Sequence, residues 1–125
     1  MNKITRTLPE AYDVLAPDGS EVRILVSALR GSMAHFTLQP GQVSKAVAHH
    51  SVEEVWYVLE GEGEMWRKSQ HDETITPLHA GVSLVIAVGT HFQFRCTSKA
   101  PLKAVGTTMP PWPGMHESFS VSGKW

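Results

Sequence analysis

The sequence contains a single cysteine, no long apolar run and no cluster of basic residues. Cys96 alone excludes an internal disulfide and is consistent with a reducing compartment. The longest apolar run, LVIAV at 84–88, is too short to span a bilayer, and residues 1–20 lack the apolar stretch of a signal peptide. We therefore expect a soluble, cytoplasmic protein with no membrane partner.

An excess of charge of either sign is also absent. Eleven Lys and Arg residues are balanced by twelve Asp and Glu residues, the formal net charge is -1, and no basic run is longer than two residues. A protein that binds nucleic acid through its phosphates normally carries a basic patch or stripe. We expect no nucleic-acid partner.

Helical periodicity is nearly absent, whereas turn residues recur throughout the chain. Turn signals occur at 16–20, 30–32, 39–42, 61–63, 79–81 and 97–101. Between them, residues 21–29 and 33–38 alternate apolar and polar side chains with the period of a half-buried strand. A chain of 125 residues is the size of one domain, so we predict a single all-β domain over 1–125, a sandwich or barrel.

Two of the expected strands are apolar on both faces. They lie at 53–60 and 82–88. In an antiparallel sheet this pattern indicates that the outer face is covered as well. A second sheet, a terminal segment or another subunit would cover it, and we expect a homodimer.

The last residues differ in composition from the rest. Residues 107–125 contain three of the eight prolines and two of the four tryptophans. Proline interrupts regular strand pairing, so we expect a core barrel over about 20–109 and an extended arm over 110–125. Its Trp112 and Trp125 should pack onto the barrel or onto a neighbour.

Residues 41–61 carry the candidate site. We expect a strand ending near His49, a tight turn, and a second strand from Glu53 to Glu60, which together form one hairpin. Strand alternation places Glu54 and Trp56 on one face, where an imidazole and a carboxylate could converge. These groups suit Zn, Fe, Mn or Ni, but a specific metal site usually needs three or four protein ligands.

These residues resemble the first conserved motif of the cupin family. Gly41, His49, Glu54 and Gly61 fall at the spacing of that motif, and Val47 stands at the place of its first histidine ligand. The resemblance implies a cupin-type double-stranded β-helix, or jelly-roll barrel.

A second cupin motif is matched by the spacing of residues 81–96. Gly81 and Gly89 agree with it, whereas Ala87 replaces a proline, Phe92 replaces the histidine ligand and Cys96 replaces an asparagine. Two of the four ligand positions of the family are therefore apolar in this chain.

A displaced metal site is one alternative. A one-residue slip or bulge would turn His91 inward in place of Phe92, giving a His49, Glu54, His91 triad. Simple alternation is the other alternative, with Phe92, Phe94 and Cys96 filling the barrel and His91 outside.

Three functions remain open at this point. The first is a small-molecule-binding barrel for a polar or sugar-like ligand, with His49 and Glu54 as polar contacts. The residues expected to form its apolar walls are Val47, Trp56, Phe92 and Phe94. The second is a metal-dependent enzyme of a dioxygenase, isomerase or lyase type, using the displaced triad and one divalent ion (Fe, Mn, Ni or Zn). The third is a metal-free epimerase or isomerase with His49 as base and Glu54 orienting it.

Overall fold

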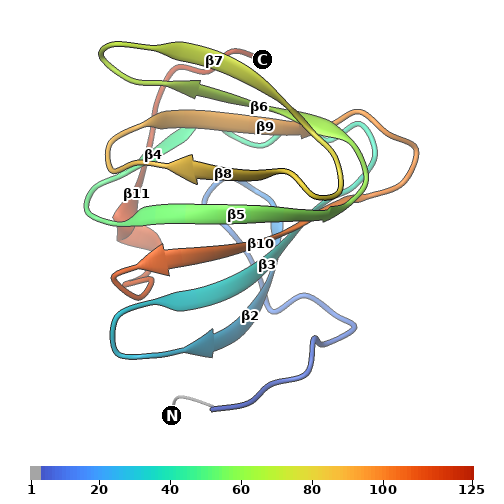
Figure 1. The fold of residues 1–125 in the computed structure, drawn as a ribbon, viewed down its shortest axis with the longest axis vertical. Coiled ribbons are helices and arrows are strands. Elements are labelled where there is room, and N and C mark those ends of the chain that lie inside the picture. The colour runs from blue at the N-terminus through green and yellow to red at the C-terminus, as the bar shows by residue number, and fades with distance from the viewer. Residues whose placement is uncertain (1–3) are drawn as a thin grey trace.

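The chain folds into two antiparallel sheets that face each other (Figure 1). A computed structural model describes residues 4–125. The six-stranded sheet has the order β1 (Val14–Leu15), β2 (Glu21–Ser27), β3 (Ser32–Leu38), β10 (Leu102–Met109), β5 (Glu53–Glu60) and β8 (Ser83–Ile86). The five-stranded sheet has the order β11 (Ser118–Ser120), β4 (Val47–His49), β9 (His91–Cys96), β6 (Gly63–Lys68) and β7 (Glu73–Leu78). The predicted all-β class is confirmed.

Helix contributes almost nothing to the described part of the chain. A single 3-10 turn, η1 (Met115–Glu117), precedes β11. Over residues 4–125, no helix has the length and apolar character needed to cross a membrane.

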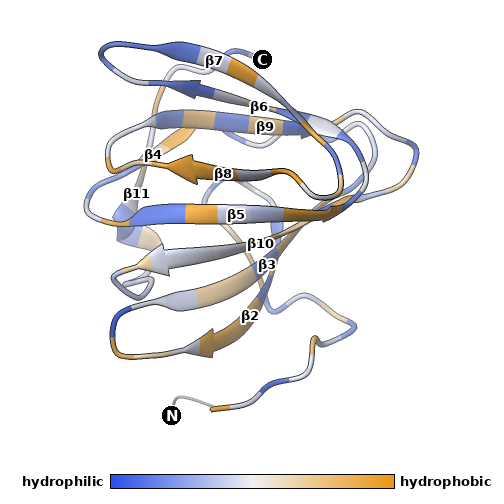
Figure 2. Ribbon diagram, viewed as in Figure 1, coloured by the Kyte–Doolittle hydropathy of each residue, from blue (hydrophilic) through white to orange (hydrophobic). Residues whose placement is uncertain are grey.

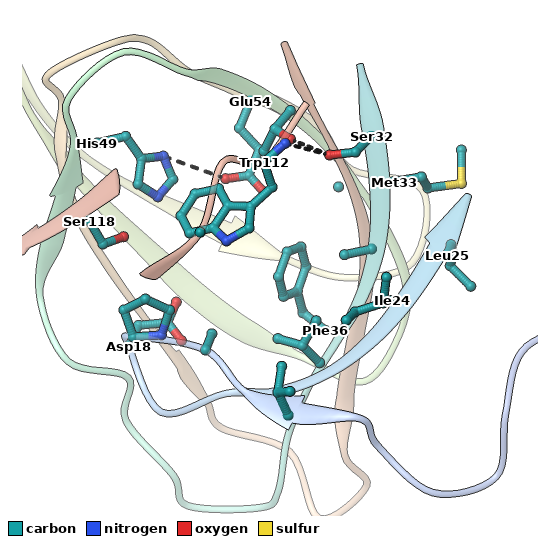
Figure 3. Close-up of a pocket in the computed structure, with 18 of the residues that line it drawn as sticks. Asp18, Ile24, Leu25, Ser32, Met33, Phe36, His49, Glu54, Trp112 and Ser118 are labelled. Carbon is teal, nitrogen blue, oxygen red and sulfur yellow. Dashed lines mark hydrogen bonds and ion pairs between the residues drawn. The ribbon is translucent and has the colours of Figure 1, made fainter. Parts of the chain in front are cut away.

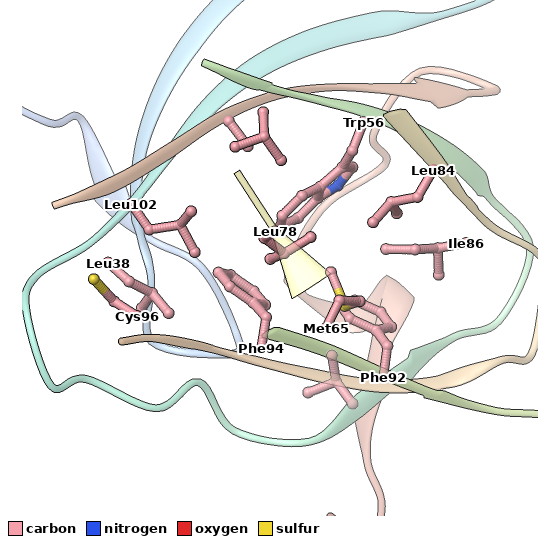
Figure 4. Close-up of a cluster of buried hydrophobic side chains, with 13 residues drawn as sticks. Leu38, Trp56, Met65, Leu78, Leu84, Ile86, Phe92, Phe94, Cys96 and Leu102 are labelled. Carbon is pink, nitrogen blue, oxygen red and sulfur yellow. The ribbon is translucent and has the colours of Figure 1, made fainter. Parts of the chain in front are cut away.

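Alternation along the strands builds the core between the sheets. In β5, Glu54, Trp56 and Val58 are buried while their neighbours in the strand are exposed. In β9, Phe92 and Phe94 point inward on the same principle. Figure 4 shows the resulting cluster, in which side chains from both sheets interdigitate.

The β5–β6 turn requires a glycine for two reasons. Gly61 has a φ of 80°, in the left-handed region that L side chains rarely adopt. A Cβ at this position would also lie 2.3 Å from the carbonyl oxygen of Pro101. The glycine therefore allows the chain to turn tightly against the start of β10.

The predicted hairpin over 41–61 is wrong. β4 pairs with β9 and β11, whereas β5 pairs with β10 and β8, so the two strands belong to different sheets. The intervening residues form a corner, which is held from outside by Glu117. Its carboxylate accepts hydrogen bonds from Ser51 N (2.5 Å), Ser51 Oγ (2.6 Å) and Val52 N (3.1 Å). A distant residue thus satisfies the backbone groups that a hairpin turn would have paired locally.

The outer face of β5 and β8 is open in the single chain. Val55, Tyr57 and Val85 are 40%, 52% and 56% exposed, and apolar segments are visible on both strands in Figure 2. Within residues 4–125, neither the second sheet nor a terminal segment covers this face. The homodimer that would cover this face stays a prediction.

The C-terminal arm packs on its own barrel. The Trp125 ring lies 4.1 Å from the guanidinium of Arg95, and its backbone N–H donates to Gln93 Oε1 at 2.9 Å. Residues 118–120 pair with β4, so the expectation of an arm without regular strand pairing is wrong at this point. They follow the last proline, Pro113, and their backbone N–H groups are free to pair.

Candidate functional site

A cavity of about 460 Å³ lies between the sheets, next to the packed core. β2, β3, β10 and β5 form one side of it, β4 and β9 another, and the C-terminal arm closes over it (Figure 3). Its lining includes the aromatic side chains Phe36, Trp56, Phe92 and Trp112 and the polar side chains Asp18, Ser27, Ser32, His49, Glu54, Thr108 and Ser118.

His49 and Glu54 approach each other from opposite sheets. His49 Nδ1 lies 3.9 Å from Glu54 Oε1, which is longer than a hydrogen bond. The two residues are 5% and 3% exposed, and His49 Nδ1 has no hydrogen-bond partner within residues 4–125. Edge-on ring contacts with Phe92 and Trp112, at centroid distances of 5.2 and 5.1 Å, hold the imidazole in place.

Burial keeps both members of this pair uncharged at neutral pH. Desolvation lowers the pKa of His49 to about 4, against a smaller opposing effect of the Glu117 carboxylate. Desolvation raises the pKa of Glu54 to about 8, with the nearby Trp56 indole opposing this rise and Asp18 adding to it. The pair is therefore a neutral imidazole beside a carboxylic acid, not an ion pair, and the Glu54 O–H is available as a donor.

Asp18 places a second buried carboxyl in the cavity wall. It lies in the loop between β1 and β2, is 8% exposed, and its Oδ1 accepts hydrogen bonds from Ser20 N (2.9 Å) and Ser20 Oγ (2.7 Å). Burial raises the pKa of Asp18, and the bonds from Ser20 offset part of that rise.

A short hydroxyl chain ties the arm to the cavity wall. Ser32 and Thr108 are direct cross-strand partners on β3 and β10, and their hydroxyl oxygens are 2.8 Å apart. The backbone N–H of Trp112 donates to Ser32 Oγ at 2.8 Å. This bond positions the Trp112 ring against His49.

Gly106 makes room for the aromatic wall. It pairs with Ala34 on one side and Trp56 on the other, in the centre of β10. A Cβ at this position would lie 2.7 Å from both Glu54 Oε2 and Phe36 Cε2. Its absence allows Phe36 to stack on Trp56, with ring centroids 5.2 Å apart and an interplanar angle of 14°.

Four of the six predicted ligand-binding residues line the cavity. They are His49, Glu54, Trp56 and Phe92. Val47 and Phe94 do not line it: both are buried in the core at 3% and 1% exposure. Phe94 instead supports Trp56 from behind, with an edge-on ring contact at 4.9 Å.

Comparison with known proteins shows the family to which the chain belongs. The family model described as "Cupin domain" matches residues 34–107. The chain belongs to the cupin family. The match confirms the resemblance seen in the two sequence motifs, and no curated protein matches the chain.

Solved structures confirm the cupin fold. A conserved protein with a double-stranded β-helix domain from Klebsiella pneumoniae is 16% identical, with a TM-score of 0.69 and coverage of 95% of this chain and 91% of that one. A Bacillus halodurans protein is 20% identical, with a TM-score of 0.69 and 89% coverage of both chains. KdgF from Halomonas is 13% identical, with a TM-score of 0.70 and coverage of 86% and 96%. At these identities the likeness shows the fold alone.

The donors present in this cupin do not fit the metal that the family implies. Val47 and Phe92, which occupy two family ligand positions, are direct cross-strand partners and are buried. β9 alternates without a slip, so Phe92 points inward and His91 is partly exposed at the strand end, opposite Lys68. Within residues 4–125, no three His, Cys, Asp or Glu side chains could hold a metal ion together. The predicted displaced triad is therefore not assembled, because no bulge turns His91 inward.

Several cavity residues were missed by sequence reasoning. Asp18 lies within a stretch that was interpreted only as a turn, and Phe36 only as one position of an alternating strand. Ser32 and Thr108 carry no local signal, since they meet only through the β3–β10 pairing. To identify Phe36, Ser32 and Thr108 from the sequence, one would need to know that β3 and β10 lie on the same side of the cavity as β5.

Proposed function

We propose that this cupin binds a small organic molecule in the cavity without a metal ion. The cavity volume of about 460 Å³ lies within the range of small-molecule sites, which are typically apolar with a few placed polar groups. Apolar side chains make up most of the lining, so the ligand has an apolar body, and sugar-like ligands would use the aromatic faces in the same way.

One observation carries this proposal: polar atoms in the cavity wall have unused hydrogen-bonding capacity. His49 Nδ1 and Trp56 Nε1 are buried and have no hydrogen-bond partner within the described chain. Buried polar groups are normally satisfied, and an exception needs an explanation. A ligand that hydrogen-bonds to His49 and Glu54 provides one.

The test is a fragment screen by two-dimensional NMR on the wild type and His49→Ala. We expect fragments with one polar group and an apolar body to shift the amide signals of residues in β3, β4, β5 and β10. His49→Ala should stay folded and lose these shifts. His79→Ala, at an exposed turn, is the matched control and should retain them. A His49→Ala variant that binds the same fragments equally well would refute the assignment.

The second candidate function is the metal-free epimerase or isomerase. A neutral imidazole close to a carboxylic acid is an acid and base arrangement, and this geometry favours it over the metal-dependent enzyme. However, a general base works best with a pKa near the operating pH, and burial lowers the pKa of His49 to about 4. We therefore place binding first. If a C–H proton of the ligand exchanges with solvent deuterium, and His49→Ala abolishes this exchange, the epimerase or isomerase would become the first candidate.

A further inference from the structure

The cavity wall contains two carboxyl side chains and no Lys or Arg from residues 4–125. The carboxyls belong to Asp18 and Glu54. Neither carboxyl is paired with a basic side chain elsewhere, since the cations in ion pairs are bound to Asp13, Glu60 and Glu64. A buried carboxyl that is ionised is normally paired with a cation or bound to a metal ion.

The spacing of His49 and Glu54 would allow one small donor group to contact both side chains. His49 Nδ1 and Glu54 Oε1 are 3.9 Å apart. A nitrogen atom placed about 2.8 Å from each, a normal hydrogen-bond length, fits between them. His49 Nδ1 is unpartnered, and a neutral imidazole nitrogen that carries no proton is an acceptor.

The aromatic walls complete the environment of a cation. Phe36, Trp56, Phe92 and Trp112 surround the cavity. Aromatic faces attract ammonium groups through their quadrupole, and the attraction grows when the site excludes water. An anionic ligand would find no Lys or Arg in this wall, and a neutral ligand could not compensate the ionised form of either carboxyl.

We propose that the ligand is a small organic amine, whose ammonium group lies between Glu54 and His49 and whose body packs against the aromatic walls. This inference rests on the proposed function, since it names the chemical class of the molecule that the cavity binds. On binding, Glu54 releases its proton to solvent, and the ammonium then donates to the Glu54 carboxylate and to His49 Nδ1. Asp18 adds a second carboxyl in the wall. Ionised Glu54 can then accept from Trp56 Nε1, whose indole already opposes the rise in the pKa of Glu54.

The first experiment compares three probes that share an aromatic ring and differ in the charge of their polar group. Benzylamine, benzyl alcohol and benzoate are titrated into the protein at pH 7.5 by isothermal titration calorimetry. We expect benzylamine to bind about tenfold tighter than benzyl alcohol, as charge-assisted hydrogen bonds are the stronger ones, and benzoate to bind weakest. Equal or tighter binding of benzyl alcohol would overturn the amine inference and leave the proposed function standing. Absence of binding by all three probes would overturn both.

Substitutions then show which side chains cause the preference for benzylamine over benzyl alcohol. Glu54→Gln keeps the size of the side chain and removes its charge, and we expect it to reduce the preference for benzylamine over benzyl alcohol about tenfold. Asp18→Asn keeps an oxygen acceptor for Ser20 and should reduce the same ratio by a smaller factor. Glu53→Gln, an exposed neighbour on the other face of β5, is the matched control and should leave the ratio unchanged. An undiminished ratio in both Glu54→Gln and Asp18→Asn, with the thermal melts unchanged, would overturn the proposal.

Discussion

The imidazole of His49 and the carboxyl of Glu54 lie 3.9 Å apart although their strands belong to different sheets. The corner at Ser51 and Val52 brings them together, and Glu117 in the C-terminal arm holds that corner. Folding, arm docking and site geometry therefore depend on one another. Each prediction below tests one part of that dependence.

The opposite pKa shifts of the pair predict a stability maximum in mildly acidic solution. The pKa of Glu54 is raised from 4.5 to about 8, so the folded state loses stability as the pH rises through this range. The pKa of His49 is lowered from 6.5 to about 4, so the folded state loses stability as the pH falls through that range. We expect the contribution of the pair to the free energy of unfolding to be greatest between pH 4.5 and 6.5.

Glu54→Gln isolates the alkaline limb of this profile. The amide cannot ionise, so the variant should gain on the order of a few kcal/mol over the wild type at pH 8.5, since one pKa unit corresponds to about 1.4 kcal/mol. Near pH 5 the gain should vanish. Urea unfolding at both pH values measures it, with Glu53→Gln as the control. A pH-independent difference would contradict the raised pKa of Glu54.

Gly106→Ala should close the cavity and destabilise the fold. The added methyl group would lie 2.7 Å from Phe36 Cε2 and from Glu54 Oε2, so the aromatic stack must move. We expect a loss of about 1–3 kcal/mol, typical of overpacking, together with a changed tryptophan fluorescence spectrum. Thr107→Ala, with its side chain on the opposite face of β10, is the control and should stay within about 0.5 kcal/mol. A fully stable Gly106→Ala variant would contradict this prediction, because it would show that the aromatic side chains beside Gly106 can move without loss of stability.

Glu117→Ala should release the corner and the arm together. Three hydrogen bonds to the carboxylate are lost, and the N–H of Val52 is left buried without a partner. We expect a loss of about 1–3 kcal/mol in urea unfolding at pH 7, with Glu62→Ala, an exposed site, as control. Burial raises the pKa of the Glu117 carboxyl, but the hydrogen bonds from Ser51 and Val52 outweigh burial and lower this pKa overall. The stabilisation that Glu117 provides should therefore fade as the pH drops below about 4.5. A loss independent of pH would contradict this role.

Sequence reasoning succeeded where the signal was local or set by motif spacing. The alternation in 53–60 correctly placed Glu54 and Trp56 inward, and the spacing of two motifs placed His49 and Phe92 beside them. Both signals depend only on residue order along a strand. The all-β class and the cupin fold followed from them.

The remaining features depend on pairings between distant segments. The corner after His49 looks like a hairpin turn until Glu117, far along the chain, is seen to satisfy its N–H groups. Thr108 enters the cavity because β10 pairs with β5, and Asp18 because its loop lies against the segment before β4, where Lys45 N donates to Asp18 O. No periodicity in one segment encodes such a meeting.

The donor set predicts a protein without a stoichiometric metal ion. Only His49 and Glu54 remain of the four family positions, and His91 lies outside the cavity. We expect elemental analysis of tag-free wild type to show far less than one equivalent of Fe, Mn, Ni or Zn, and His91→Ala to be indistinguishable from it. Near one equivalent in the wild type that is lost in His91→Ala would restore the displaced triad.

The same reasoning predicts that the metal site can be rebuilt. Val47 and Phe92 are cross-strand partners beside His49, so the double variant Val47→His/Phe92→His adds two imidazoles to the existing imidazole and carboxyl. Four such ligands suit a divalent ion, and we expect Zn or Ni binding near one equivalent and a metal-dependent rise in melting temperature. Adding Glu54→Gln to the double variant should weaken this binding. A folded double variant that binds no metal would show that adding the two histidines is not enough to form a metal site.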